Sequence, residues 1–230
     1  MSRVWLALTL TFFLLASCNP QPAALDPTPV QPTASPETTW LEGEAAGVEF
    51  GLWKPLGWDA DTRGGLILAE QTVDTSEAVG SAIKGAVVNF FCPNLDIFTH
   101  HAESPNRALD IMTQAIALQH VRSVAAGISQ PVAFDWRGHD AAFYLLSGYG
   151  GIRTIVIGVY LPERDKLLAA NISMPAHETE RVRAMLPQLF AGFVIDGVEL
   201  GGEAMDSLPQ PLVFPTGPDD LPRPGDHPGG

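Results

Sequence analysis

The fold class of this 230-residue chain is decided by the run IVIGVYL at residues 155–161. The run is largely β-branched and does not alternate with polar residues, so it predicts a strand whose two faces are both buried. A second run of this kind, AVVNFF, stands at residues 86–91. Strands of this composition belong to a sheet that other elements cover on both sides.

The last four predicted strands follow one another closely. The links between them are short and rich in glycine, proline and aspartate, so these strands should form an antiparallel meander. The glycine-rich link at 147–151 runs from strand to strand, whereas a phosphate-binding loop would lead into a helix, so we interpret it as a turn. Pro131 predicts an edge or a bulge. The predicted strands are residues 47–54, 65–70, 83–92, 128–136, 139–147, 152–161 and 166–174.

Two segments have helical periodicity. Ser104-Pro105 supplies a capping residue and a proline for the first turn of a helix that should end near Arg122. A second helix is predicted over about 177–192, with Pro187 bending it or starting its last turn. The order of elements predicts an α+β fold, in which a mainly antiparallel β-sheet is flanked by two helices in an α/β/α sandwich.

Composition and charge exclude several classes of protein. Hydrophobic residues make up 46% of the chain, which is enough for a core and excludes global disorder. The formal net charge is −13, and no basic stripe interrupts the acidic balance, so binding to nucleic acid or to an anionic lipid surface is not expected. Two cysteines are too few for a disulfide framework.

The N-terminus predicts export. Arg3 precedes an apolar run at residues 4–16, which as a helix is about 20 Å long against about 30 Å for the hydrocarbon core of a membrane, so residues 1–17 are predicted to be a signal peptide. Leu15, Ala16, Ser17 and Cys18 resemble the lipobox of bacterial lipoproteins. That resemblance implies cleavage before Cys18 and its modification with diacylglycerol and a fatty acid such as palmitate. The alternative is an ordinary secretory signal with a chance cysteine.

Composition divides the rest of the chain. Residues 18–38, which begin with the cysteine to be acylated, are proline-rich and predict an extended linker. Residues 39–200 predict one α/β domain. Residues 201–230 are rich in proline and glycine and predict a disordered tail. The protein is expected on the outer side of the cell membrane or in the outer membrane, anchored by lipid.

The domain resembles the PsbP-like group, which includes DcrB-like bacterial lipoproteins. The resemblance rests on a strand that runs into Pro55-Leu56-Gly57-Trp58, and on the hairpin sequence RGHDAAF at residues 137–143. It implies an accessory or binding protein, because members of the group are mostly not enzymes. No catalytic residues can be carried over from it.

Few residues in the sequence indicate a metal site or a catalytic site. His100, His101 and Glu103 are the best candidates for a metal site, but adjacent histidines without a second spaced pair favour a solvated loop. Cys92 ends an apolar strand and is expected to be a buried, inert thiol. No nucleophile motif is present, so we predict neither an enzyme nor a cofactor.

Three tryptophans are the better clue to function. Trp53, Trp58 and Trp136 fall at predicted strand ends, where they either fill the core or, if exposed together, form a partner-binding patch. We therefore expect a lipid-anchored accessory module for another envelope protein or complex. The alternatives are a lipoprotein that binds a small ligand or a metal, and a hydrolase with an unrecognised site.

Overall fold

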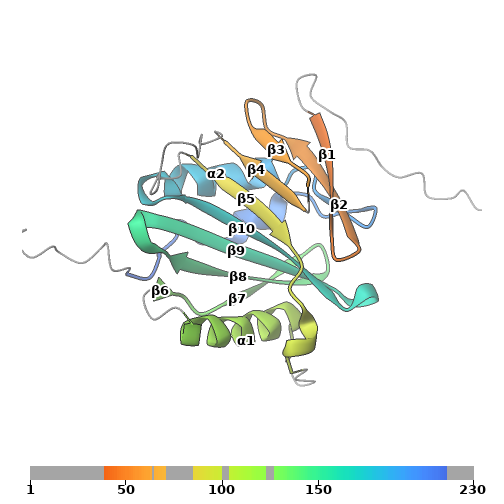
Figure 1. The fold of residues 1–230 in the computed structure, drawn as a ribbon, viewed down its shortest axis with the longest axis vertical. Coiled ribbons are helices and arrows are strands. Elements are labelled where there is room, and N and C mark those ends of the chain that lie inside the picture. The colour runs from red at the N-terminus through yellow and green to blue at the C-terminus, as the bar shows by residue number, and fades with distance from the viewer. Residues whose placement is uncertain (1–38, 64, 71–84, 100–103, 123–126, 217–230) are drawn as a thin grey trace, which may run out of the picture. The chain divides into compact units, whose positions relative to one another are not determined.

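The computed structural model describes residues 39–63, 65–70, 85–99, 104–122 and 127–216 (Figure 1). Its larger sheet is antiparallel throughout, in the order β3-β4-β5-β10-β9-β8-β6, with β7 also paired to β8. The strands are β3 (Asp59–Asp61), β4 (Leu66–Ala69), β5 (Val87–Phe91), β6 (Gly127–Ile128), β7 (Val132–Trp136), β8 (His139–Ser147), β9 (Ile152–Leu161) and β10 (Lys166–Pro175).

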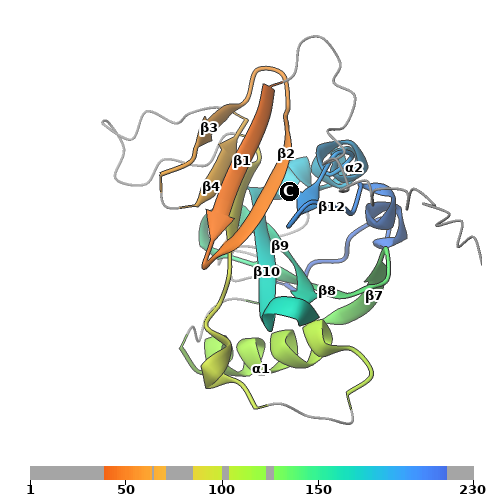
Figure 2. The same cartoon turned by 90° about the vertical axis from the view of Figure 1, so that its right-hand side faces the viewer.

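A smaller antiparallel sheet, in the order β1-β2-β11-β12, lies beside the larger one (Figure 2). β1 (Thr39–Ala45) and β2 (Val48–Lys54) form a hairpin, and β11 (Val194–Ile195) and β12 (Val198–Glu199) are very short. β1, β3, β11 and β12 were not expected from the sequence.

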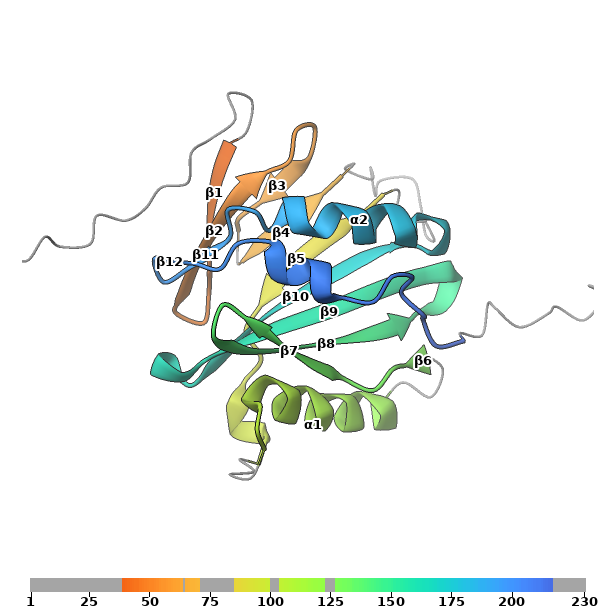
Figure 3. The same ribbon diagram turned by 180° about the vertical axis from the view of Figure 1, so that it is seen from behind.

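The larger sheet is covered on both faces, as its apolar strands predict. α1 (Arg107–Arg122) lies on one face, and α2 (Thr179–Leu189) lies on the other together with the smaller sheet (Figure 3). Gly158 in the middle of β9 lets α1 approach closely, because a Cβ there would lie 2.5 Å from Met112 Cε. The predicted α+β class with an antiparallel sheet between two helices is therefore confirmed.

Aromatic rings join the two sheets and α2 into one core. Phe193 stacks on Phe90 and on Trp136, with ring centroids 5.6 Å apart in both pairs, and Phe50 of the smaller sheet lies 5.0 Å from Phe90. Phe190 meets Phe193 edge-on at 5.3 Å. Such aromatic pairs stabilise a core beyond the area that they bury.

The sequence-based boundaries hold best in the meander. β8 and β9 match the predicted 139–147 and 152–161, and the strand predicted at 128–136 is divided by Pro131 into β6 and β7. α1 begins at Arg107, where the Asn106 side chain accepts from the Leu109 N–H at 2.8 Å, so the predicted cap at Ser104 is two residues too early. α2 contains Pro187 in its last turn, as expected.

The predicted disordered tail is wrong for residues 201–216. Met205, Leu208 and Leu212 are buried against the core, so this segment has enough apolar side chains to offset its ordering, although its average composition hides them. The buried Arg183 of α2 donates to the carbonyl oxygens of Asp206, Leu208 and Pro209, which fixes the segment to the helix.

Candidate partner-binding surface

The two faces of β2 have opposite character. Val48, Phe50 and Leu52 point inward and are at most 3% exposed. Because side chains alternate along a strand, Gly51 and Trp53 are on the outer face of the smaller sheet. Trp53 is half-buried but does not belong to the buried core, so its ring lies at the surface.

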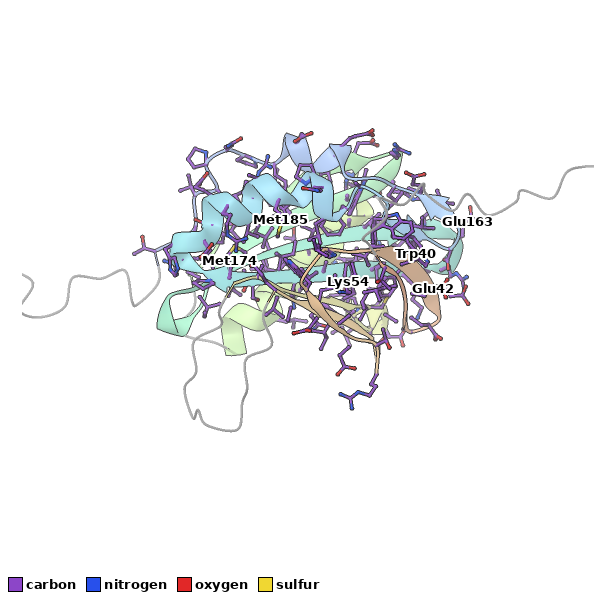
Figure 4. The ribbon with its side chains drawn as sticks, turned by 90° about the horizontal axis from the view of Figure 1, so that it is seen from above. Trp40, Glu42, Lys54, Glu163, Met174 and Met185 are labelled. Atoms are coloured by element: carbon purple, nitrogen blue, oxygen red, sulfur yellow. The ribbon has the colours of Figure 1, made fainter. Side chains whose placement is uncertain are left out.

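Trp40 of β1 completes an aromatic pair on this outer face. It is the register partner of Trp53, and the two rings meet edge-on with centroids 5.0 Å apart and planes at 67°. Trp40 lies over Gly51, where any Cβ would overlap its ring. Its Nε1–H donates to Glu42 Oε1 at 3.3 Å, which helps to orient the ring. Figure 4 shows Trp40 and Glu42 together on the hairpin.

Carboxylates continue the outer face from the tryptophan pair toward the tip of the hairpin. Glu42 and Glu44 follow Trp40 at alternate positions of β1, Glu49 pairs with Glu44 across the hairpin, and all three are exposed. Within the described part of the chain, none of the three forms an ion pair with a lysine or arginine. We call the surface made by Trp40, Trp53, Gly51, Glu42, Glu44 and Glu49 the tryptophan face.

Lys54 is the basic residue nearest in sequence to these carboxylates, and its ammonium group binds a backbone carbonyl instead. Lys54 is on the inward side of β2, since it continues the Val48, Phe50, Leu52 alternation, and its Nζ donates to the Trp58 carbonyl at 2.6 Å. Lys54 therefore does not neutralise the negative charge of the tryptophan face.

An ion pair holds the tip of the β1–β2 hairpin in place. Arg164 binds both carboxylate oxygens of Asp196 at 2.7 and 2.9 Å and also donates to the Gly47 carbonyl. The Glu49 N–H in turn donates to Asp196 Oδ1 at 3.2 Å. Bidentate pairing of this kind fixes geometry, so the face is a preorganised surface on a sheet and not a free loop.

The structure does not bring the three tryptophans together in a surface patch. Trp58 is 6% exposed and Trp136 is 2% exposed, and the Trp136 Nε1–H donates to the Gly201 carbonyl at 2.8 Å inside the core. Trp53 is at the surface, but its aromatic partner is Trp40. The condition for a joint patch of Trp53, Trp58 and Trp136 is thus not met, because two of these rings fill the space under the larger sheet.

Trp40 was missed because it stands next to the proline-rich segment and was not assigned to a strand. A signal was present. Trp40, Glu42 and Glu44 alternate in the way a strand does, and the Ala46-Gly47 turn, with φ of 51° and 83°, brings that strand back onto β2.

Cys92 lies at the end of β5, partly buried against the core. Burial raises the pKa of its thiol to about 11, although Lys166 nearby lowers it in part. At neutral pH the thiol is therefore protonated, and this agrees with the expectation of an inert cysteine.

The polar cluster at the start of α1 is structural. Arg107 Nη1 donates to Asp110 Oδ2 at 2.5 Å and to the Thr99 carbonyl, and Gln114 bridges Asp110 and Thr99. Asp140 of β8 accepts from the Arg107 backbone N–H at 2.7 Å. These bonds attach residues 95–99 and β8 to α1, and both carboxylates accept hydrogen bonds from neighbouring groups.

Several predicted features lie outside the described residues: the signal peptide, Cys18 with its lipobox residues Leu15, Ala16 and Ser17, and the metal candidates His100, His101 and Glu103. Across the described ranges, no three His, Cys, Asp or Glu side chains gather where they could hold a metal ion. Neither described helix has the length and hydropathy needed to cross a membrane.

No family model and no curated protein matches the chain. Among solved structures, it is similar to the solution structure of cyanobacterial PsbP (CyanoP) from Synechocystis sp. PCC 6803, with 13% sequence identity, coverage of 72% of this chain and 96% of that chain, and a TM-score of 0.45. A likeness at this identity concerns the course of the backbone.

Proposed function

We propose that the protein is a non-enzymatic accessory or binding module of the cell envelope, and that it recognises a partner protein through the tryptophan face. The observation that carries this proposal is the pair Trp40–Trp53, held 5.0 Å apart at the surface of a fixed hairpin. Tryptophan is among the residue types most enriched at binding hot spots. Neither ring of this pair belongs to the buried core.

The surroundings of the pair fit a docking surface. An aromatic centre with a polar rim is the usual anatomy of a protein–protein interface. Gly51 beneath Trp40 lets the indole approach the backbone more closely than any side chain with a Cβ would allow, which restricts the orientation of the ring. Because less conformational freedom remains to be lost on binding, a preorganised ring contributes more to affinity.

The membrane anchor is a separate part of the proposal. The lipobox resemblance at residues 15–18 supports acylation of Cys18, and the proline-rich residues 18–38 would connect the anchor to the domain. The resemblance of the segment ending at Trp58 to PsbP-like proteins supports an accessory role. The protein would then present the tryptophan face to other proteins at the outer side of a membrane.

A pull-down tests both parts. The full chain, tagged at its C-terminus, is expressed in its own host, mildly cross-linked, solubilised in detergent and recovered for mass spectrometry. Variants Trp40→Ala and Trp53→Ala remove the aromatic pair, and Cys18→Ala removes the acylation site. Ile97→Ala is the matched control, because Ile97 is an exposed apolar residue (64%) next to α1 and outside the tryptophan face.

We expect a stoichiometric envelope protein to be recovered with the wild type and with Ile97→Ala, and to be reduced about tenfold or more with either tryptophan variant. Cys18→Ala should release the protein from membranes and abolish fatty-acid labelling. A partner that is captured equally by the tryptophan variants would refute the role of this face, and a Cys18→Ala protein that stays labelled would refute the anchor.

A further inference from the structure

The charges around the tryptophan face limit what can bind there. Glu42, Glu44 and Glu49 are exposed and have no basic partner among the described residues. Elsewhere in the described chain, arginines are already matched to carboxylates, as in Arg63–Asp61, Arg137–Glu203 and Arg181–Glu70. A partner that covers the face must therefore bring positive charge of its own, or else desolvate these carboxylates without compensation.

We propose that the tryptophan face binds an extended, arginine-bearing segment of the partner protein. This inference rests on the proposed function and specifies the chemistry of the partner. An arginine guanidinium stacks on an indole ring, which is the best aromatic surface for a cation, and it pairs in a planar fork with a carboxylate. The tryptophan face offers both groups side by side, because Trp40 hydrogen-bonds Glu42 at 3.3 Å.

The spacing of the face suits an extended chain. Trp40, Glu42 and Glu44 occupy alternate positions of β1, so their side chains project from one face at intervals of about 7 Å. Alternate side chains of an extended segment have the same interval. Arginines at every second position of such a segment can then contact the indole and the two carboxylates in turn.

Other occupants fit less well. Nucleic acid and anionic lipid would bring phosphate against the three carboxylates, and the net charge of −13 opposes both. A second copy of this chain carries the same net charge and the same acidic rim. An apolar helix would cover the two indoles but would leave the carboxylates buried and unpaired.

The test uses the full chain and two synthetic peptides of nine residues. One peptide alternates glycine and arginine, and the other has citrulline, a neutral isostere, in place of each arginine. Fluorescence anisotropy of the dye-labelled peptides gives the dissociation constants at low and at high salt. The protein variants are Trp40→Ala, Glu44→Gln and the matched control Glu180→Gln, which neutralises an exposed carboxylate on α2.

The arginine peptide should bind at least tenfold more tightly than the citrulline peptide, and the difference should shrink at high salt. Trp40→Ala should weaken arginine-peptide binding about tenfold or more, Glu44→Gln should weaken it severalfold, and Glu180→Gln should leave it unchanged. Equal binding of the two peptides, or equal binding by Trp40→Ala and the wild type, would overturn the inference.

Two further measurements decide the question if a variant fails to fold or if the peptide does not bind. Glu42→Gln combined with Glu44→Gln touches no core residue, so it tests the carboxylates even if Trp40→Ala fails to fold. The pull-down separates this inference from the proposed function. A host partner that depends on Trp40 while the arginine peptide does not bind would refute the arginine chemistry and leave the binding module standing.

Discussion

The two faces of the smaller sheet differ sharply in burial, although the same strand, β2, contributes to both. On the inner face, Val48, Phe50 and Leu52 are almost completely buried and contact the aromatic core. On the outer face, Trp53 lies beside Trp40, and the Trp40 ring covers Gly51. The inner residues are explained by the fold, whereas the outer residues are large, ordered and unnecessary for the core.

The same contrast separates side chains that fill the core from side chains that lie on the hairpin. Met174 of β10 is buried and Met185 of α2 is partly buried, and in Figure 4 both lie under or along α2, where they fill the space between helix and sheet. Trp40 and Lys54 lie on the hairpin, apart from that helix. An aromatic residue outside every packed layer indicates function more strongly than one at a strand end.

The largest expected effect is on the free energy of unfolding, and it differs between the inner and the outer face of β2. Phe50→Ala should lower the free energy of unfolding by about 3–5 kcal/mol, because it leaves a cavity against Phe90 and Phe193. Trp53→Ala, three positions further along the same strand, should cost less, about 1–2 kcal/mol, because its ring lies at the surface and is only partly buried. Urea denaturation measures both values, and similar losses for the two variants would break the distinction.

A smaller difference in stability is expected between a carboxylate that forms an ion pair and one that does not. Burial opposes the ionisation of Glu70, but hydrogen bonds from Arg181 and from the Ala86 N–H outweigh it and lower the pKa of Glu70. A lowered folded-state pKa means that this contribution to stability is present above the pKa of the unfolded chain and is lost as the pH falls through the folded-state value.

Glu70→Gln should therefore cost about 0.5–1 kcal/mol at pH 7, since the pair is partly exposed, and the cost should disappear in acid. Glu44→Gln on the tryptophan face breaks no ion pair with a described residue and should change stability at pH 7 by less than about 0.5 kcal/mol. Thermal unfolding of the two variants and the wild type at pH 7 and pH 3 measures the difference. A cost for Glu70→Gln that persists unchanged at pH 3 would contradict the ion-pair explanation.

The larger sheet could be predicted because its strands obey a local rule. β8, β9 and β10 are long, apolar on both faces and joined by short turns, so periodicity and turn residues located them closely. The two-residue strands β11 and β12 have no periodicity to detect. β11 forms on the edge that β2 offers in the folded chain, and β12 pairs in turn with β11.

The tryptophan face could not be located for a related reason. Its sequence signal is an alternation over residues 40–44, but the pairing of Trp40 with Trp53 depends on a register that only the folded hairpin fixes. Burial of Trp58 and Trp136 likewise depends on contacts with residues distant in sequence, such as Gly201. Composition also misjudged residues 201–216, because Met205, Leu208 and Leu212 are buried while Pro209 and Pro211 between them are exposed.

The most direct test of the central claim observes each tryptophan separately. The full chain is labelled with 5-fluorotryptophan, its ¹⁹F resonances are assigned with single Trp→Phe variants, and the arginine peptide is titrated in. We predict that the Trp40 and Trp53 resonances shift or broaden in parallel, while those of Trp58 and Trp136 stay in place. Unchanged Trp40 and Trp53 resonances at saturating peptide, or equal changes at the buried tryptophans, would contradict it.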